Sequence, residues 1–97
     1  MATATLSPAD IIQQFERYVV PNYIRTPIVL ERGSGSQVWD TDGTRYLDFF
    51  PGWGCNLLGH CPPTVIAAVR DQLETLIHVP NTWYTKSQGR WAELLCE

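Results

Sequence analysis

Residues 33–60, GSGSQVWDTDGTRYLDFFPGWGCNLLGH, decide how this chain folds. Apolar and polar side chains alternate within residues 37–40 and again within residues 45–49, which is the pattern of two half-buried strands. The intervening Asp42–Gly43 pair supplies the positive φ angles that a two-residue hairpin turn requires. We therefore predict a β-hairpin at the centre of the chain.

A third strand is predicted just before this hairpin, at residues 28–32, where Ile-Val-Leu-Glu-Arg is rich in β-branched and apolar side chains. The Gly-Ser-Gly-Ser run at residues 33–36 should end it. Together the three strands would form a small antiparallel sheet.

The hairpin is followed by a glycine-rich segment, FPGWGCNLLGH, at residues 50–60. It has no apolar period and combines glycines, which permit unusual backbone angles, with a large aromatic ring and polar ends. Such a segment suits the wall of a pocket better than a strand or helix.

The first helix is predicted from about Pro8 to Val19. Ser7 is a good N-cap, Pro8 suits the first helical position, and Asp10 places negative charge in the first turn. Pro21 should end the helix. The expected apolar face comprises Ile11, Ile12, Phe15, Tyr18 and Val19.

Two further helices are predicted in the C-terminal third. One begins at residues 62–63, Pro-Pro, and runs to about Leu76, and the other begins with a capping box formed by Thr85 and Gln88. The last helix reaches Glu97 while its apolar face still repeats, and no stop signal precedes that point. We therefore expect the chain to be the opening part of a larger domain.

Composition excludes several classes of protein. The 97 residues are 44% hydrophobic, enough for one small domain or a piece of a larger one. The net charge is −3 with scattered basic residues, so neither nucleic acid nor a membrane surface is an expected partner. No secretory signal or membrane-spanning run is recognisable, and three cysteines suit reduced thiols, so we expect a cytoplasmic protein.

Several side chains invite a catalytic or metal-binding interpretation without forming a motif. Zinc-ligand types occur at Cys55, His60, Cys61 and His78, but their spacing matches no zinc finger or ribbon, so no metal site is expected. A Cys–His nucleophile pair stays open in principle, although small buried thiols and a histidine at a helix entry account for the same residues.

Two other motifs are weaker still. The Gly-Ser-Gly run at residues 33–35 precedes no helix, so its amides would not converge on a phosphate. Lys86 is the only lysine, and its position at an exposed helix start does not offer the desolvated pocket that a Schiff-base lysine requires.

From about Tyr18 onward, the order of residues resembles the N-terminal segment of class III pyridoxal-phosphate aminotransferases, and within that class the branch acting on acetylornithine and ornithine. The motifs that carry the resemblance are Tyr23, Arg25-Thr26-Pro27, Glu31-Arg32-Gly33-Ser34-Gly35, Val38-Trp39-Asp40-Thr41-Asp42-Gly43, Tyr46-Leu47-Asp48-Phe49, Gly52, Asn56, Leu58-Gly59-His60, His78, Asn81 and Tyr84-Thr85.

The resemblance implies a fold type I enzyme, in which a large α/β domain with a mainly parallel sheet joins a small domain built from both chain ends. Residues 1–97 would supply the N-terminal part of the small domain and the start of the large one. The implied protein is a homodimer with active sites at the subunit interface. Its implied reaction transfers the amino group of N-acetylornithine to 2-oxoglutarate on lysine-bound pyridoxal 5′-phosphate, in arginine biosynthesis.

The resemblance also implies roles for particular residues. The expected wall of the substrate pocket comprises Tyr23, Gly52, Trp53, Gly54, Cys55 and Asn56. The expected dimer interface near the neighbouring site comprises Asn81, Trp83 and Tyr84. In the family, the cofactor-binding motif, the aspartate at the pyridine nitrogen and the lysine all lie downstream of Glu97, so this chain should hold no catalytic or cofactor-binding residue and be inactive alone.

Two alternatives stay open. Trp53 is large for its position in the acetylornithine branch, so ornithine, succinylornithine and 4-aminobutyrate remain possible amine donors. The residues alone also permit a free-standing α+β interaction module that binds proteins through the exposed rings of Trp53, Trp83 and Trp91.

Overall fold

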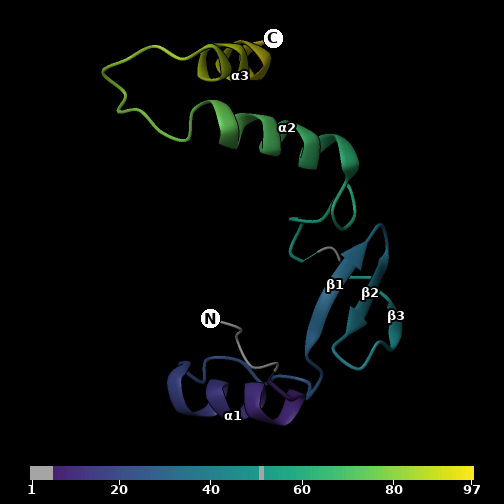
Figure 1. The fold of residues 1–97 in the computed structure, drawn as a ribbon. Coiled ribbons are helices and arrows are strands. Elements are labelled where there is room, and N and C mark those ends of the chain that lie inside the picture. Colours follow the sequence, from purple (N-terminus) through teal and green to yellow (C-terminus); the bar gives the residue numbers. More distant parts are fainter. Residues whose placement is uncertain (1–5, 51) are drawn as a thin grey trace. The chain divides into compact units, whose positions relative to one another are not determined.

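The computed structural model describes residues 6–50 and 52–97, so Pro51 of the glycine-rich segment lies outside the described residues. The elements follow the order α1 (Pro8–Tyr18), β1 (Leu30–Ser34), β2 (Gln37–Asp40), β3 (Arg45–Leu47), α2 (Pro63–Thr75) and α3 (Lys86–Cys96) (Figure 1). Two compact units divide the chain, Met1–Pro62 and Pro63–Glu97. The predicted combination of helices with a small three-stranded antiparallel sheet is confirmed.

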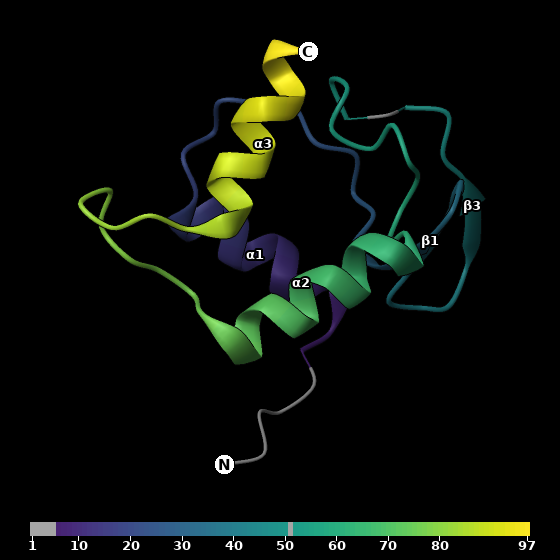
Figure 2. The ribbon, with the colours of Figure 1, turned by 90° about the horizontal axis from the view of Figure 1, so that it is seen from above.

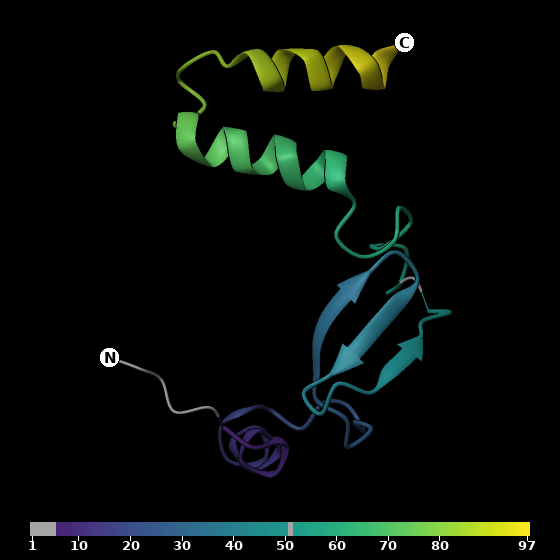
Figure 3. The same ribbon diagram turned by 45° about the vertical axis from the view of Figure 1, so that its right-hand side comes forward.

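The sheet has the strand order β1-β2-β3, and both neighbouring pairs are antiparallel (Figure 3). On the central strand, Val38 pairs with Gly33 on one side and Tyr46 on the other. Val38 is the one buried apolar side chain in the described part of the chain, with 8% of its surface exposed. The sheet therefore organises the first unit without enclosing a core of its own.

The tight turn of the sheet lies one hairpin earlier than the sequence predicts. Ser34 pairs with Gln37, which leaves only Gly35 and Ser36 between β1 and β2. Gly35 has a φ of 57°, the positive angle that a two-residue hairpin needs at its first position. The strand predicted at residues 28–32 therefore lies at residues 30–34, and the break predicted at residues 33–36 is confined to residues 35–36. The reason is that glycine fits both an extended strand and this turn.

The predicted two-residue turn at Asp42–Gly43 is wrong, because Asp40 and Thr44 pair across a three-residue loop, residues 41–43. Asp40 N–H donates to the Thr44 carbonyl at 3.1 Å, and Gly43 N–H donates to the Asp40 carbonyl at 3.0 Å. Gly43 alone has a positive φ, 83°, so the loop is a type I turn followed by one left-handed residue. Asp40 Oδ1 holds the loop by accepting from the Asp42 and Thr44 amides at 3.0 and 2.7 Å.

The helices begin where the sequence indicates. Ser7 Oγ accepts from Asp10 N–H at 3.2 Å, while Asp10 Oδ2 accepts from Ser7 N–H at 3.0 Å, a complete capping box. The second unit contains the helices α2 and α3 (Figure 2). The first begins at Pro63, and the second follows the N-cap Thr85, whose Oγ1 accepts from Gln88 N–H at 3.4 Å. None of the three helices has a fully buried side chain among the residues that the structure describes.

Among residues 6–50 and 52–97, no helix combines the length and the apolar character needed to cross a lipid bilayer.

Candidate functional site

The glycine-rich segment returns to the sheet at His60. The His60 N–H donates to the Gly35 carbonyl at 2.8 Å, and the His60 carbonyl accepts from Gly35 N–H at 3.0 Å. The two hydrogen bonds form an antiparallel bridge to the β1-β2 turn. The imidazole lies so close to Gly33 that a Cβ there would be 2.7 Å from His60 Cγ. A Cβ on Gly59, which has a φ of 78°, would lie 2.9 Å from the Gly35 carbonyl oxygen. The glycines permit this close approach.

Asp48, just after β3, holds the same region through its carboxylate. Its Oδ2 lies 2.7 Å from His60 Nε2, and its Oδ1 accepts from Phe50 N–H at 2.9 Å. Its own N–H donates to the Ser36 carbonyl at 2.8 Å. The hydrogen bond with His60, and after it the one from Phe50, holds the pKa of Asp48 below its ordinary value of 3.8. Asp48 is therefore a carboxylate at neutral pH.

Trp53 stands on a strained turn. Cys55 N–H donates to the Gly52 carbonyl at 3.2 Å, and the two central residues have φ angles of 58° for Trp53 and 92° for Gly54. These angles define a type I′ turn, which normally carries Asn-Gly at these positions. A non-glycine residue held there costs on the order of 1–3 kcal/mol. The Trp53 indole is 88% exposed and meets Phe50 edge to face, with ring centroids 5.4 Å apart.

The predicted wall residues are only partly brought together. Gly52 and Asn56 line a 660 Å³ hollow that also includes Arg25, Asp48 and His60. Trp53, Gly54 and Cys55 continue the same loop but do not line this hollow. The Asn56 carbonyl accepts from Gly59 N–H at 2.9 Å, which makes a second turn in the loop.

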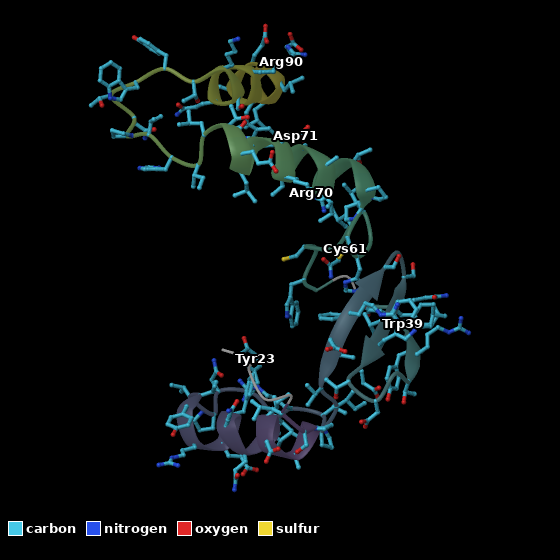
Figure 4. The ribbon with its side chains drawn as sticks, in the orientation of Figure 1. Tyr23, Trp39, Cys61, Arg70, Asp71 and Arg90 are labelled. Carbon is cyan, nitrogen blue, oxygen red and sulfur yellow. The ribbon has the colours of Figure 1, made fainter. Side chains whose placement is uncertain are left out.

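Tyr23 lies apart from these residues, on the connector beside α1 (Figure 4). It contributes to a different hollow, of 720 Å³, between α1 and residues 21–30. Four of the residues predicted for the apolar face of α1 line this hollow: Ile11, Ile12, Phe15 and Val19. Tyr18, also predicted for that face, is largely exposed. The structure thus assigns Tyr23 to the surroundings of the first helix.

The residues expected at a dimer interface lie in the second unit. Trp83 N–H donates to the Pro80 carbonyl at 3.1 Å, which closes a turn around Asn81. Asn81 and Trp83 line a 310 Å³ hollow together with the end of α2 and the start of α3. Trp83 is 66% exposed and Tyr84 fully exposed, so both rings are available to a partner surface.

The cysteines considered for metal binding or nucleophilic catalysis are more exposed than expected. Within the part of the chain that the structure describes, no three His, Cys, Asp or Glu side chains gather as a metal site requires. Cys55, Cys61 and Cys96 are free and exposed, so the interpretation as small buried thiols is wrong. They lie on a loop, a helix entry and a helix end, where nothing in the described residues covers them.

The pairing of His60 with Asp48 escapes the sequence, which indicates only a histidine at a helix entry. Asp48 and His60 flank the glycine-rich segment, and each belongs to a motif of the family resemblance. Their positions on either side of this segment are the one feature of the sequence that points to the pair. The partners lie twelve positions apart in the sequence, so no local pattern reveals that they meet.

The chain is similar in sequence to a family of known proteins. A family model described as aminotransferase class-III matches residues 18–97. The acetylornithine aminotransferase of Myxococcus xanthus is 42% identical over 96 residues, which are 99% of this chain and 24% of that protein. That of Methanocaldococcus jannaschii is 44% identical over 92 residues, 95% of this chain and 23% of that protein. The chain therefore spans about a quarter of the length of the curated relatives it matches.

Solved structures agree with the sequence relatives. An ornithine aminotransferase from Toxoplasma gondii superposes with a TM-score of 0.87 at 32% identity, covering 93% of this chain and 21% of that one. An acetylornithine aminotransferase from Elizabethkingia anophelis gives a TM-score of 0.87 at 28% identity, covering 94% of this chain and 24% of that one. Because the family model covers most of the sequence and the fold matches, this chain belongs to the class III aminotransferases.

Proposed function

We propose that this chain is the N-terminal part of a pyridoxal-phosphate-dependent aminotransferase of arginine biosynthesis, whose amine donor is N-acetylornithine or a similar ornithine derivative and whose acceptor is 2-oxoglutarate. The observation that carries the proposal is the alignment of 99% of this chain with a segment that makes up 24% of the length of an acetylornithine aminotransferase. Membership of class III implies dependence on pyridoxal phosphate.

Unsatisfied apolar surface supports the assignment to the small domain and the start of the large domain. Val38 is buried, whereas the large apolar side chains along α2 and α3 are exposed. These exposed side chains are Val65, Ile66, Val69 and Leu73 on α2, Leu76 directly after it, and Trp91, Leu94 and Leu95 on α3. A folded domain buries such rows against another element, so the remaining part of the parent enzyme and a second subunit would cover them. In the proposed homodimer, Asn81, Trp83 and Tyr84 contact the neighbouring subunit.

The described residues do not form a cofactor site by themselves. Lys86, the only lysine of the sequence, is exposed on the first turn of α3, where water would solvate its ammonium group. A lysine that binds a carbonyl cofactor works from a desolvated pocket. We therefore assign no step of the reaction to Lys86, and the proposal leaves cofactor binding to the part of the parent enzyme beyond Glu97.

This chain would contribute to binding the amine substrate. The turn at Trp53 supports this role, because strained backbone angles concentrate at ligand-contacting sites. Gly52 and Asn56 line the neighbouring hollow, and Gly54 and Cys55 complete the loop. In the proposal, this loop forms one side of the wall that the substrate side chain meets, and Tyr23, from the separate hollow beside α1, forms another. The large Trp53 ring would decide which ornithine derivative fits.

A chimera tests the proposal. Residues 1–97 are joined to the part of the Myxococcus xanthus enzyme that follows its aligned segment, and the Myxococcus enzyme is the matched control. Glutamate formation from 2-oxoglutarate is measured with N-acetylornithine, ornithine, succinylornithine and 4-aminobutyrate. We expect kcat/KM to be highest with N-acetylornithine. A chimera that folds, binds pyridoxal phosphate and prefers 4-aminobutyrate would refute the substrate assignment.

The isolated chain provides the second arm. With pyridoxal phosphate followed by dialysis, it should retain no cofactor absorbance, because the described residues lack a suitable lysine environment. A chain that unfolds cooperatively in urea as a stable monomer would instead support the free-standing interaction module.

A further inference from the structure

Both ends of the glycine-rich loop are held by one side chain. Asp48 Oδ1 accepts from Phe50 N–H at 2.9 Å at the start of the loop. Asp48 Oδ2 contacts His60 Nε2 at 2.7 Å at its end. The carboxylate is half-buried, and each of its oxygens serves a different end of the same loop.

We propose that Asp48 is a positioning residue that clasps the ends of the loop from Phe50 to His60 and thereby sets where Trp53 and Asn56 meet the amine substrate. The inference rests on the proposed aminotransferase function. It concerns a residue that is not among the expected wall residues, although it lines the same hollow as Gly52 and Asn56.

The backbone of the loop explains why a clasp is needed. Gly52, Trp53, Gly54 and Gly59 all have φ angles between 58° and 92°. Three of these four residues are glycines, whose backbone has the largest conformational freedom to lose on ordering. Tying the two ends together restricts the conformations that the loop samples, so less ordering remains to be done when a ligand binds.

The clasp is anchored to the most regular part of the unit. Asp48 N–H donates to the Ser36 carbonyl, and His60 forms its two backbone hydrogen bonds with Gly35, the neighbour of Ser36 in the same turn. The β1-β2 turn thus supports both partners of the clasp. His60 is attached both to Asp48 and to this turn. A displacement of Asp48 would therefore displace the end of the loop at His60.

Asp40 provides a matched comparison within the same sheet. Its carboxylate also accepts backbone amides and a side-chain donor, but those groups belong to residues 42–46 of its own hairpin. Replacing Asp40 should therefore weaken the sheet without moving the glycine-rich loop. Replacing Asp48 should release the loop.

The experiment uses the chimera defined above, with D48A, D48N and H60A as test variants and D40A as the control. Asn at position 48 keeps an acceptor for Phe50 N–H and an amide donor for a neutral His60, so it should rescue. Steady-state kinetics with the preferred amine are combined with hydrogen–deuterium exchange of residues 50–60 in the cofactor-free protein. Thermal unfolding reports stability for each variant.

We expect D48A to raise KM for the amine by about tenfold or more while kcat changes less than about threefold, since misplaced binding groups are lost from ground state and transition state alike. Exchange in residues 50–60 should accelerate. H60A, which frees one end of the loop only, should give a smaller rise in KM. D48N should have a KM and a loop exchange rate close to those of the parent chimera. D40A should lower the unfolding temperature with KM unchanged.

The proposal is overturned if D48A and H60A leave both KM and loop exchange unchanged, or if they only reduce the folded fraction with the same KM as D40A. Should D48A fail to fold, H60A decides by the same criteria, and D48N should still match the parent chimera. A chimera that uses none of the amines would contradict the proposed function, while accelerated exchange in D48A would still support the clasp.

Discussion

Tyr46 Oη donates a hydrogen bond of 2.7 Å to Asp40 Oδ2, and the other oxygen of the same carboxylate accepts the amides of Asp42 and Thr44. Asp40 lies at the end of β2, and Tyr46 pairs with Val38 from β3. One carboxylate therefore shapes the three-residue loop and ties it to the adjoining strand. Buried or half-buried polar groups satisfied in this way specify a unique arrangement of the backbone.

Removal of the Asp40 carboxylate should destabilise the β2-β3 hairpin. In the chimera, D40A leaves the Asp42 and Thr44 amides without their acceptor, and the unfolding temperature should fall by about a few degrees. D40N retains one acceptor oxygen, so its unfolding temperature should fall less. Differential scanning calorimetry measures the change. Equal unfolding temperatures for D40A and D40N would show that the loop amides do not depend on this oxygen.

The same pair predicts a loss of stability in both acid and base. The hydrogen bond from Tyr46, the largest of several causes, holds the pKa of Asp40 below its ordinary value of 3.8, so its stabilising contribution is present above that value and lost as pH falls through the lower folded value. The hydrogen bond to Asp40 raises the pKa of Tyr46 above 10.0, so that contribution is lost as pH rises through the raised value.

Unfolding midpoints measured from below pH 3.8 to above pH 10.0 test both predicted losses of stability, with Y46F as the test variant. Y46F should flatten the alkaline loss of stability, since its ring cannot ionise, and should remove from the ultraviolet titration of the folded chimera one phenol whose pKa is raised. An unchanged alkaline arm in Y46F would contradict the assignment.

Three glycines should respond to alanine in a graded order. G59A combines a φ of 78° with a Cβ only 2.9 Å from the Gly35 carbonyl oxygen, so it should be the most destabilising. G43A has a φ of 83° but open space, and should cost about 1 kcal/mol from backbone strain alone. G89A lies in α3 with nothing within 4 Å and should stabilise by up to about 1 kcal/mol. Chemical denaturation of the chimera gives the three values, and any other order would count against these backbone conformations.

Arg32 and Trp39 should be energetically coupled. They are cross-strand partners in β1 and β2, and the guanidinium carbon lies 4.0 Å from the centroid of the indole. A double-mutant cycle with R32A and W39A should give a coupling of about 0.5–1 kcal/mol, as for cation–π pairs at exposed sites. The exposed Arg90–Glu93 ion pair on α3 is a useful control, whose coupling should be smaller and decline with salt. A cycle that closes to zero would show that Arg32 only lies near the ring.

Trp53 should show a trade between stability and substrate binding. Asparagine is favoured at the first central position of a type I′ turn, so W53N should relieve the strain at a φ of 58° and stabilise the chimera by up to about 1 kcal/mol. If the indole contacts the substrate, KM for the preferred amine should rise at the same time. Thermal unfolding and steady-state kinetics measure the two effects. A stabilised variant with unchanged KM would place Trp53 outside the substrate pocket.

Local signals predicted the secondary structure because they act over a few residues. The Ser7 cap, the proline at the start of α2 and the Thr85 cap each appear where their chemistry indicates. The hairpin turns follow less directly from local signals. Gly35 and Gly43 both permit positive φ, and the hydrogen bonds of the Asp40 carboxylate decide that residues 41–43 form the longer loop.

The amino-acid sequence by itself determined the positions of the helices, the number of strands and the family, because caps, periodicity and motif order are properties of neighbouring residues. The tertiary structure alone decided that Asp48 meets both Phe50 and His60, and that Tyr23 lies with α1 and not in the hollow beside Asn56. Those relationships depend on where the β1-β2 turn brings separate segments together, and a hydrogen bond across twelve residues leaves no periodic trace in the sequence.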